Sequence, residues 1–312
     1  MKIFVNRKIV NGPWGGGNKF VQALFSHATK LGHEVVNTWD DDIDVIHLQD
    51  VHSDSLGASA DMCLRYKKYN PKVKIVHRVN DMDLGRYGSK PWRDDAYVHY
   101  SGIFDASIFV SEWTKQFFLD KGWKCISNYV ATNGVDKDIF KPMEKINNNK
   151  INIVTHHWSD NKGKGFDIYE AIDRFLEEND DFTFTYIGRE RGTFKNSIVV
   201  APLSGPKLGQ ALGKHDVYVS ASEYENCPNH ILESLACKIP TYAISSGGAS
   251  VGIVGDNHIF NNWEDLRKIL LLKKFSNNKY SPPSWKECIE KYCSIYQLIT
   301  NGEKNGIRTR NK

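Results

Sequence analysis

The sequence predicts an α/β protein built from two doubly wound domains, and three observations support this prediction. The chain has 312 residues, which is long enough for two domains of ordinary size, and 40% of the residues are hydrophobic, which is enough to fill two cores. Short β-rich runs alternate with helical patterns, as in parallel sheets built from βαβ units. A polar stretch with turn formers, PMEKINNNK at residues 142–150, separates two such series.

The first series predicts an N-terminal domain over residues 1–145. Stretches such as NKFVQALFSHATKLGH and SEWTKQFFLDKG have apolar residues at i, i+3 and i+4, which is typical of helices that pack on a sheet. The runs between them are rich in β-branched and aromatic residues and are expected to be strands. These runs are KIFV, DVIHL, KIVHRV, DASIFVS and ISNYVAT.

The second series predicts a C-terminal domain over residues 146–283. Its expected strands are INIVTH, FTFTYIG, NSIVVA, DVYVSAS and IPTYAIS, and FDIYEAIDRFLEEN is expected to be a helix. Beyond Trp263 the pattern becomes helical, and WKECIEKYCSIYQLI predicts an amphipathic helix over residues 284–300. The last residues, 301–312, are polar and predict a flexible tail.

Composition and charge narrow the class of protein. The net charge of +4 is spread along the chain without a dominant basic block, so no nucleic-acid partner is expected. No apolar run approaches the ~20 residues that span a bilayer, and the N-terminus lacks the apolar core of a secretory signal. We therefore expect a cytoplasmic protein with at most weak peripheral membrane contact. Six cysteines without a CxxC pair argue against a zinc ribbon and a thioredoxin-like site.

A glycine-rich loop follows the first expected strand. In NGPWGGGNKF, a run of three glycines, the last two being Gly16 and Gly17, leads into a helix that is expected to begin near Asn18. Glycines let the backbone approach a bulky anion, and the N–H groups at a helix start favour phosphate or a sugar hydroxyl. The loop does not match GxGxxG, and a flexible hinge is the alternative.

A second loop, VTHHWSDNKGKGFD, joins an expected strand to an expected helix. Lys162 and Lys164 lie in its glycine-punctuated turn, where an ammonium group can reach a diphosphate. A surface turn that is merely basic is the alternative.

A third loop, in SEYENCPNHILESLACKIP, places Glu225 and Glu233 eight residues apart around an expected helix start. Pro228 and Asn229 suit a helix N-terminus, and Asn229 could cap it. The positive end of that helix would face the same ligand as the two carboxylates. The alternative is that Glu233 is the solvated flank of an amphipathic helix.

Taken together in chain order, these stretches resemble glycosyltransferases with the GT-B fold, in the group that is numbered family four. The resemblance rests on the glycine loop followed by LGHEV, on FVSEWTKQFF followed by NGVDKDIFKP, on KGKGFD, and on DVYVSASEYENCPNHILESLACKIPTYAISSGG with its E-x7-E spacing. It implies two Rossmann-like domains that face a cleft, with a C-terminal helix that crosses back to the N-terminal domain. It also implies retaining transfer of a sugar from a UDP- or GDP-sugar to a glycan, lipid-linked or other hydroxyl acceptor, with no metal or other cofactor.

The resemblance also implies residue roles. Glu233 matches the glutamate that binds the ribose of the donor, Glu225 the one that meets the donor sugar, and Lys164 the lysine that neutralises the diphosphate. Gly16 and Gly17 match the N-terminal loop. The other expected donor contacts are Asn18, Lys162, Asn229, His230 and Ile231.

Two further residues match positions near the transferred sugar in the same family. These are His77 and Asp81, in KIVHRVND at a strand end. An ordinary strand histidine is the alternative for His77, and a turn cap is the alternative for Asp81.

Three positions depart from the family pattern and weaken the details of the phosphate and sugar contacts. Ser159 stands where the family commonly has an arginine, with His156 and His157 nearby. Ser250 and Val251 follow GGA where an acidic residue is usual, and Lys238 replaces a glycine.

Other functions remain open at this stage. A nucleotide-sugar 2-epimerase shares the fold, and a silent nucleotide-sugar or glycan-binding protein would fit the missing arginine. The acidic runs at residues 40–42 and 81–83 could suggest metal-binding carboxylates, but the flanking pattern favours the two-domain, metal-independent type. The sequence contains no HExxH motif, so we expect no catalytic zinc.

Overall fold

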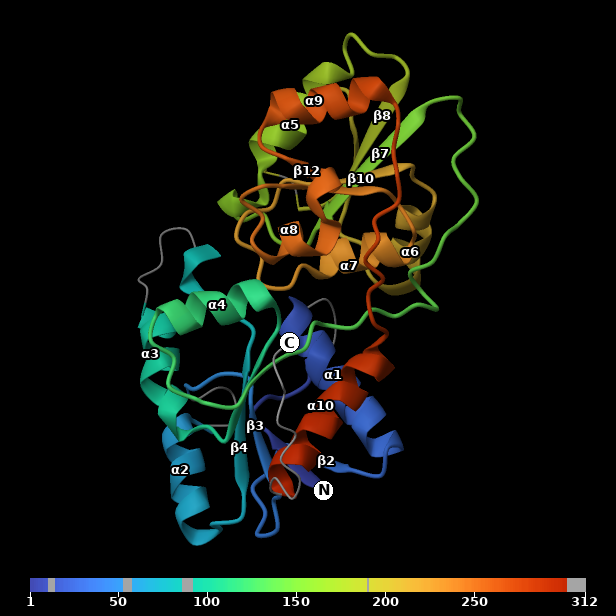
Figure 1. Cartoon of the computed structure of the whole chain (residues 1–312). Coiled ribbons are helices and arrows are strands. Elements are labelled where there is room, and N and C mark those ends of the chain that lie inside the picture. The colour runs from blue at the N-terminus through green and yellow to red at the C-terminus, as the bar shows by residue number, and fades with distance from the viewer. Residues whose placement is uncertain (11–14, 53–57, 86–91, 190, 302–312) are drawn as a thin grey trace, which may run out of the picture. The chain divides into compact units, whose positions relative to one another are not determined.

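A computed structural model of the chain describes residues 1–10, 15–52, 58–85, 92–189 and 191–301 (Figure 1). The chain divides into two compact units. Unit 1 comprises Met1–Asn80, Trp92–Thr132 and Trp285–Lys312, and unit 2 comprises Asp81–Pro91 and Asn133–Ser284. The chain therefore passes from unit 1 to unit 2 after Thr132, ahead of the polar stretch at residues 142–150.

Unit 1 contains a six-stranded parallel sheet in the order β2-β1-β3-β4-β5-β6. Its strands are β1 (Lys2–Val5), β2 (Glu34–Val36), β3 (Val45–Leu48), β4 (Lys74–Val79), β5 (Ala106–Phe109) and β6 (Asn128–Val130). The central strands β3 and β5 are buried at every position. Burial on both faces explains why these strands read as nearly continuous apolar runs.

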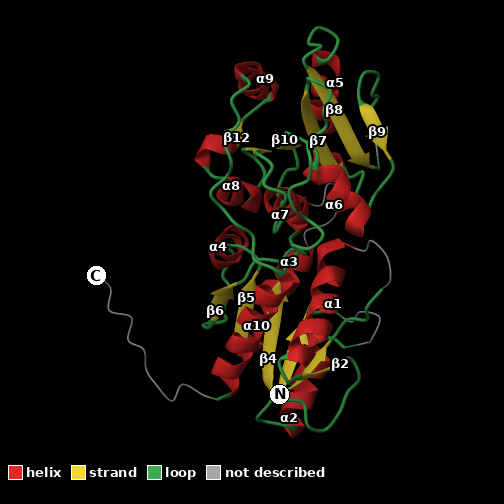
Figure 2. Cartoon of the chain, turned by 90° about the vertical axis from the view of Figure 1, so that its right-hand side faces the viewer, coloured by secondary structure: helices red, strands yellow, loops and turns green. Residues whose placement is uncertain are grey.

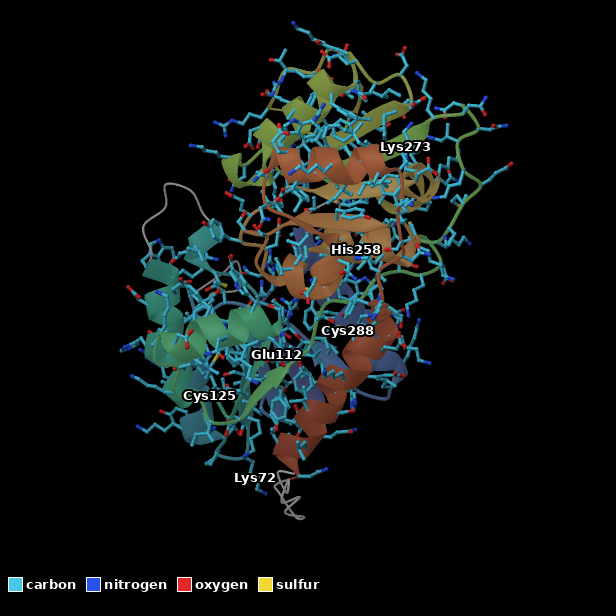
Figure 3. All side chains as sticks on the ribbon, turned by 45° about the horizontal axis from the view of Figure 1, so that its top comes forward. Lys72, Glu112, Cys125, His258, Lys273 and Cys288 are labelled. Atoms are coloured by element: carbon cyan, nitrogen blue, oxygen red, sulfur yellow. The ribbon has the colours of Figure 1, made fainter. Side chains whose placement is uncertain are left out.

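The helices of unit 1 include the predicted C-terminal helix. They are α1 (Gly15–Lys30), α2 (Ala60–Tyr69), α3 (Trp92–Tyr100), α4 (Glu112–Asp120) and α10 (Trp285–Thr300), with a short η2 turn (Ser101–Ile103). Helix α10 lies beside α1 (Figure 2) and adds Cys288, Ile289 and Tyr292 to the core of unit 1. Figure 3 labels Cys288 on this helix. The Tyr296 hydroxyl lies 2.6 Å from Nδ1 of His47. The C-terminal helix thus returns to the N-terminal unit, as predicted.

Unit 2 contains a second six-stranded parallel sheet, in the order β12-β11-β10-β7-β8-β9. Its strands are β7 (Ile151–His157), β8 (Phe182–Gly188), β9 (Ile198–Val200), β10 (Val217–Ser220), β11 (Thr241–Ile244) and β12 (Ile259–Phe260). The order reverses beside β7, where β10 pairs with one edge and β8 with the other. Ligands of doubly wound sheets bind at the carboxyl ends of strands at such a reversal.

Helices cover both faces of the second sheet. They are α5 (Phe166–Phe175), α6 (Gly205–Gly213), α7 (Asn229–Ala236), α8 (Ala249–Val254) and α9 (Trp263–Leu272), with 3₁₀ turns η1 (Asp83–Gly85), η3 (Lys162–Lys164) and η4 (Asp256–His258). Helices α5 and α9 share one core with Phe184 and Val219, whereas α6 packs with Tyr218 and Val154 in another. The alternate side chains of β7 and β10 thus point to different cores.

The predicted α/β class with two Rossmann-like domains is confirmed, and every predicted strand overlaps an observed one. Two short strands, β2 and β12, were not predicted. The first helix begins at Gly15 rather than near Asn18. None of the helices in the described parts of the chain is long and apolar enough to cross a membrane. The predicted tail lies outside the described residues apart from Asn301.

Candidate donor-binding site

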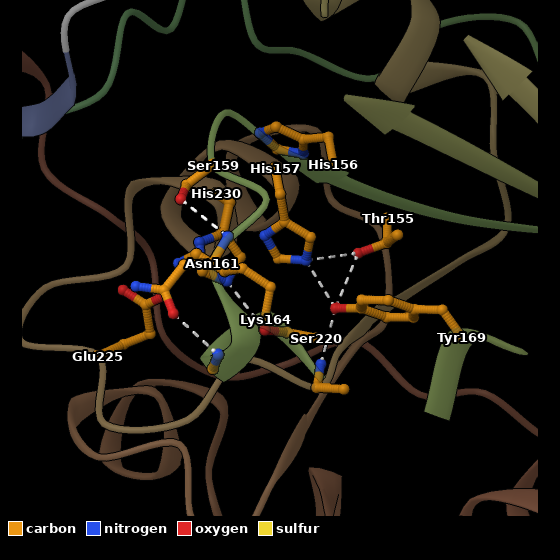
Figure 4. Close-up of polar contacts among 12 residues, drawn as sticks. Thr155, His156, His157, Ser159, Asn161, Lys164, Tyr169, Ser220, Glu225 and His230 are labelled. Atoms are coloured by element: carbon orange, nitrogen blue, oxygen red, sulfur yellow. Dashed lines mark hydrogen bonds and ion pairs between the residues drawn. The ribbon is translucent and has the colours of Figure 1, made fainter. Parts of the chain in front are cut away.

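Polar side chains gather at the carboxyl ends of β7 and β10 in unit 2 (Figure 4). The turn after β7 carries Lys164, and the loop after β10 carries Glu225 and leads into α7, which carries Glu233. Neighbouring parallel strands end at the same edge of a sheet, so the two loops meet there. The structure therefore brings together the three residues whose roles in donor binding the sequence predicts.

Lys164 and Glu225 form an ion pair, with Nζ of the lysine 2.5 Å from Oε1 of the glutamate. Both side chains are mostly buried, with about a fifth of each exposed (21% and 18%). Burial is the largest single influence on the Glu225 carboxyl and would raise its pKa, but the charge and hydrogen bond of Lys164, together with His230 and Ser222, lower this pKa to about 2. Glu225 is therefore ionised at neutral pH, and the ammonium group of Lys164 lies directly beside its carboxylate.

Glycine at position 165 lets the lysine turn lie against the end of β10. Gly165 has a φ of 73°, in the left-handed region, and a Cβ there would lie 2.3 Å from the carbonyl oxygen of Ala221. The turn is also held by Asn161, whose Oδ1 accepts the N–H of Gly163 at 3.0 Å. The second loop is therefore a fixed turn that aims Lys164, not a loose basic loop.

The Glu225 loop is anchored by the glycine loop after β11. The N–H of Glu225 donates to the carbonyl of Gly247 at 3.2 Å, and the N–H of Ala249 donates to the carbonyl of Glu225 at 2.8 Å. Tyr224, next to it, adopts a positive φ of 53°. These bonds give the carboxylate a fixed place between the lysine turn and the start of α8.

Glu233 lies in the second turn of α7 and is only 6% exposed, so it is not a solvated helix flank. Its Oε2 lies 2.9 Å from Nε2 of His156, at the end of β7. The other ring nitrogen of His156 lies 3.1 Å from the hydroxyl of Tyr218 on β10. A buried carboxylate needs such partners, and they fix its direction.

The start of α7 differs in detail from the prediction. Pro228 occupies the N-cap position, and no side chain caps the helix. Asn229 does not cap it, because its Oδ1 accepts a hydrogen bond from Nδ2 of Asn133 at 2.7 Å. Ile231 is fully buried, and its N–H donates to the Pro228 carbonyl, so it is a core residue rather than a donor contact.

Three histidine rings lie side by side at this edge of the sheet. The ring centroid of His230 lies 5.1 Å from that of His157 and 6.2 Å from that of His156. Nε2 of His230 contacts the hydroxyl of Ser220 at 2.8 Å. Burial lowers the pKa of His230 to about 3, the charge of Glu225 opposes this shift, and the charge of Lys164 adds to it. His230 is therefore neutral near pH 7.

Sequence reasoning missed the second layer of this cluster. Tyr169 from α5 contacts Nε2 of His157 at 2.6 Å and accepts the N–H of Ala221 at 2.9 Å. Tyr218 holds His156 from β10. Both tyrosines are buried in strand and helix patterns that predict only core packing, so no local signal marked them.

Two arginines of the segment after β8, Arg189 and Arg191, lie beside the lysine turn, where Ser159 occupies the position of the family's arginine. The Oγ atom of Ser159 accepts the N–H of Asn161 at 3.1 Å. The guanidinium of Arg189 lies over the ring of Trp158, 4.3 Å from its centroid. Arg191 lines a cavity of about 380 Å³ together with Lys162 and Ser159. Lys162 thus faces a second, basic hollow beside the turn.

The predicted glycines of unit 1 lie in the first turn of α1. The N–H groups of Gly16 and Gly17 are in the part of a helix where N–H groups have no acceptor within the helix, so they suit an anion. Asn18 is buried and serves the loop itself, since its side chain bonds to both the N–H and the carbonyl of Val10, at 2.9 and 2.7 Å.

His77 is a core residue of unit 1. Its ring is fully buried on β4 among the rings of Tyr97, Phe104 and Trp123, and within the described chain neither ring nitrogen has a hydrogen-bond partner. Burial, followed by the charge of Arg78, lowers the pKa of His77 to about 3. A neutral, enclosed ring cannot reach a ligand. Asp81 lies just beyond the strand, and its Oδ1 accepts the N–H of Met82 at 3.0 Å.

Among the described residues, no group of three or more histidine, cysteine, aspartate or glutamate side chains could hold a metal ion. The acidic run at residues 40–42 instead surrounds Lys2, whose Nζ lies 2.7 Å from Asp42.

No protein-family model matches the chain. A probable sucrose-phosphate synthase of Thermosipho melanesiensis is 24% identical over 185 residues, which cover 53% of this chain and 44% of that protein. The match therefore spans less than half the length of that curated relative.

Solved structures match over nearly the whole chain. Sucrose-phosphate synthase from Thermosynechococcus elongatus has a TM-score of 0.63 at 12% identity, with 96% of this chain and 94% of that one covered. Anabaena HepE in complex with UDP and glucose has a TM-score of 0.64 at 13% identity, with 95% and 94% covered. Together with the two parallel six-stranded sheets, these matches show that the chain has the GT-B fold of two Rossmann-like domains.

Proposed function

We propose that the protein is a glycosyltransferase that moves a sugar, with retention of configuration, from a nucleotide-diphosphate sugar to a hydroxyl acceptor. The observation that carries this proposal is the arrangement of Glu225 and Glu233 on either side of the α7 N-terminus, with Lys164 bonded to the first of them. A donor has a ribose at one end and a sugar at the other, with a diphosphate between them. The two carboxylates lie on one chain segment, on either side of a helix start that would face the diphosphate, and the lysine reaches the first of them from the turn after β7.

Each group suits one part of the donor. Glu233 would accept hydrogen bonds from the ribose hydroxyls, and Glu225 would accept them from the sugar. Lys164, together with the N–H groups at the start of α7, would stabilise the negative charge that grows on the diphosphate as it leaves. In this proposal the chain's own cation and dipole supply that stabilisation, and no metal is needed.

A UDP-sugar is the donor that we propose first. Structural neighbours of the same fold were solved with UDP and with UDP-glucose, and Anabaena HepE is among them. The probable sucrose-phosphate synthase and its structural counterpart are named for the synthesis of a sugar phosphate. The acceptor that we propose is a glycan, a lipid-linked saccharide or another hydroxyl compound.

Turnover of a donor panel tests this function. The protein is incubated with UDP- and GDP-sugars, with and without saccharide acceptors, and released nucleoside diphosphate is followed by a coupled assay. We expect release with at least one donor, abolished or strongly reduced in the Lys164→Ala variant. The anomeric proton signal of the product, recorded by NMR, then shows whether configuration is retained.

A silent nucleotide-sugar-binding protein is the second candidate, because Ser159 occupies the position where the family commonly has an arginine. It would bind the nucleotide in calorimetry yet release none from any donor. An isomerised donor formed without acceptor would instead indicate an epimerase.

A further inference from the structure

His157 has no part in the donor-binding roles proposed above. It is the last residue of β7, it is 4% exposed, and its ring meets that of His230 edge-on. Lys164 is close enough for its charge to act on the imidazole. His157 therefore lies at the edge of the sheet where we propose that the diphosphate binds.

One side of the His157 ring is fully engaged. Nε2 lies 2.6 Å from the hydroxyl of Tyr169 and 3.3 Å from the hydroxyl of Thr155 (Figure 4). Nδ1 has no hydrogen-bond partner among the described residues, and in Figure 4 the ring turns this edge toward the side of His230 and Lys164. The two nitrogens thus have different surroundings, one occupied and one open.

Proton counting at Tyr169 decides which nitrogen carries hydrogen. The phenol oxygen accepts the backbone N–H of Ala221 at 2.9 Å and the hydroxyl of Thr155 at 3.3 Å. Its single proton is then left for the shortest contact, Nε2 of His157, which must accept it. Burial lowers the pKa of His157 well below its usual value, and the charges of His230 and Lys164 act in the same direction. The neutral ring has one proton, and that proton belongs on Nδ1.

We propose that Tyr169 fixes His157 in the Nδ1–H tautomer, and that this N–H donates a hydrogen bond to the diphosphate of the nucleotide donor. This rests on the proposed function. Tyr169 is a positioning residue in this scheme, and His157 is the residue that touches the ligand. The imidazole adds a directed, uncharged donor beside Lys164, whose ammonium is shared with Glu225.

The tautomer is directly measurable in protein labelled with ¹⁵N-histidine. In the ligand-free protein we expect the His157 signals to show a protonated Nδ1 and an unprotonated Nε2, assigned by their loss in the His157→Asn variant. Saturating UDP should shift the Nδ1–H resonance and leave the tautomer unchanged. A proton on Nε2, or an Nδ1–H resonance that does not respond to bound UDP, overturns the proposal.

Side-chain replacement tests the same bond without spectroscopy. The amide nitrogen of an asparagine can occupy the place of Nδ1, and that of a glutamine the place of Nε2. His157→Asn should therefore bind UDP within about threefold of the natural protein, whereas His157→Gln should bind it about tenfold more weakly, as for one lost hydrogen bond to a charged group. Equal losses in the two variants contradict the assignment.

A double-mutant cycle separates positioning from packing. Tyr169→Phe should weaken UDP binding about fivefold in the natural background and should cost nothing further in His157→Asn, where no imidazole remains to be held. Equal costs in both backgrounds would mean that Tyr169 acts only through the N–H of Ala221. If Tyr169→Phe fails to fold, the NMR result on the natural protein still decides.

The outcomes distinguish this inference from the proposed function. If the natural protein binds no UDP or other nucleoside diphosphate by calorimetry, the proposed function fails. If UDP binds and the His157 signals and variants do not respond, this inference alone fails.

Discussion

Replacing Lys164 with alanine removes the cation that we place against the leaving diphosphate. The Nζ atom of Lys164 lies 2.5 Å from Glu225, and the pKa of that carboxyl falls from 4.5 to about 2 although burial opposes the shift. At about 1.4 kcal/mol per pKa unit, the lysine and the other polar neighbours together stabilise this carboxylate by a net amount on the order of 3 kcal/mol, and the lysine makes the largest favourable contribution. A developing diphosphate charge should interact with it at least as strongly.

We therefore expect Lys164→Ala to lower kcat by about 10²-fold or more, since about 2.7 kcal/mol of transition-state stabilisation corresponds to that factor. The assay is release of nucleoside diphosphate at saturating donor. The matched control is Lys162→Ala, two residues away in the same turn and exposed, which should matter less. Equal losses in the two variants would show that the wrong lysine was chosen, and a Lys164→Ala enzyme within threefold of the natural one would refute the electrostatic role.

The same variant should change the pH dependence in a defined direction. In the natural protein Glu225 stays ionised down to about pH 2, because Lys164 holds the pKa of its carboxyl low. Without the lysine, burial dominates and raises that pKa. The acid limb of the residual activity should therefore move to higher pH, while the Lys162→Ala profile should keep its natural position.

Three other outcomes are expected. Glu225→Ala should leave UDP affinity unchanged or improved, because it frees the ammonium, while turnover falls; weaker UDP binding by calorimetry would speak against its contact with the sugar. Gly165→Ala should lower the thermal midpoint by several degrees, since its Cβ would clash with Ala221 in a left-handed backbone; an unchanged midpoint would contradict the fixed turn. Ending the chain after Ser284 removes α10 from the core of unit 1 and should make the protein insoluble, so a soluble truncation with a natural midpoint would refute this packing.

The strands and the C-terminal helix could be predicted because their signals are local. The run at residues 182–187 consists only of aromatic and β-branched residues, and Cys288, Tyr292 and Cys293 recur on one face of α10. Strands β2 and β12 have only three and two residues, too few for a pattern. Helix α1 begins earlier than predicted because glycines have poor intrinsic helix propensity, which tertiary contacts override here.

The sequence also predicted the spacing of Glu225 and Glu233 and the lysine turn, because each lies within one short segment. It did not predict the hydrogen bonds that orient these side chains. Tyr169 and Tyr218 reach the histidines from elements distant in the sequence, and in the sequence both look like ordinary core residues. His77 is the reverse case. The sequence suggests that it lies at the end of a strand near a ligand, but the strand is covered on both faces and its ring is buried.

The central claim is that the donor nucleotide binds at Glu233. Calorimetric titration of UDP into the natural protein and into Glu233→Ala tests this directly, with Glu178→Ala, an exposed glutamate in the same unit, as the control. We predict that the natural protein and the control bind alike and that Glu233→Ala binds about 5- to 150-fold more weakly, as for 1–3 kcal/mol from a lost charged hydrogen bond. Equal affinity in all three proteins would contradict the placement of the donor site.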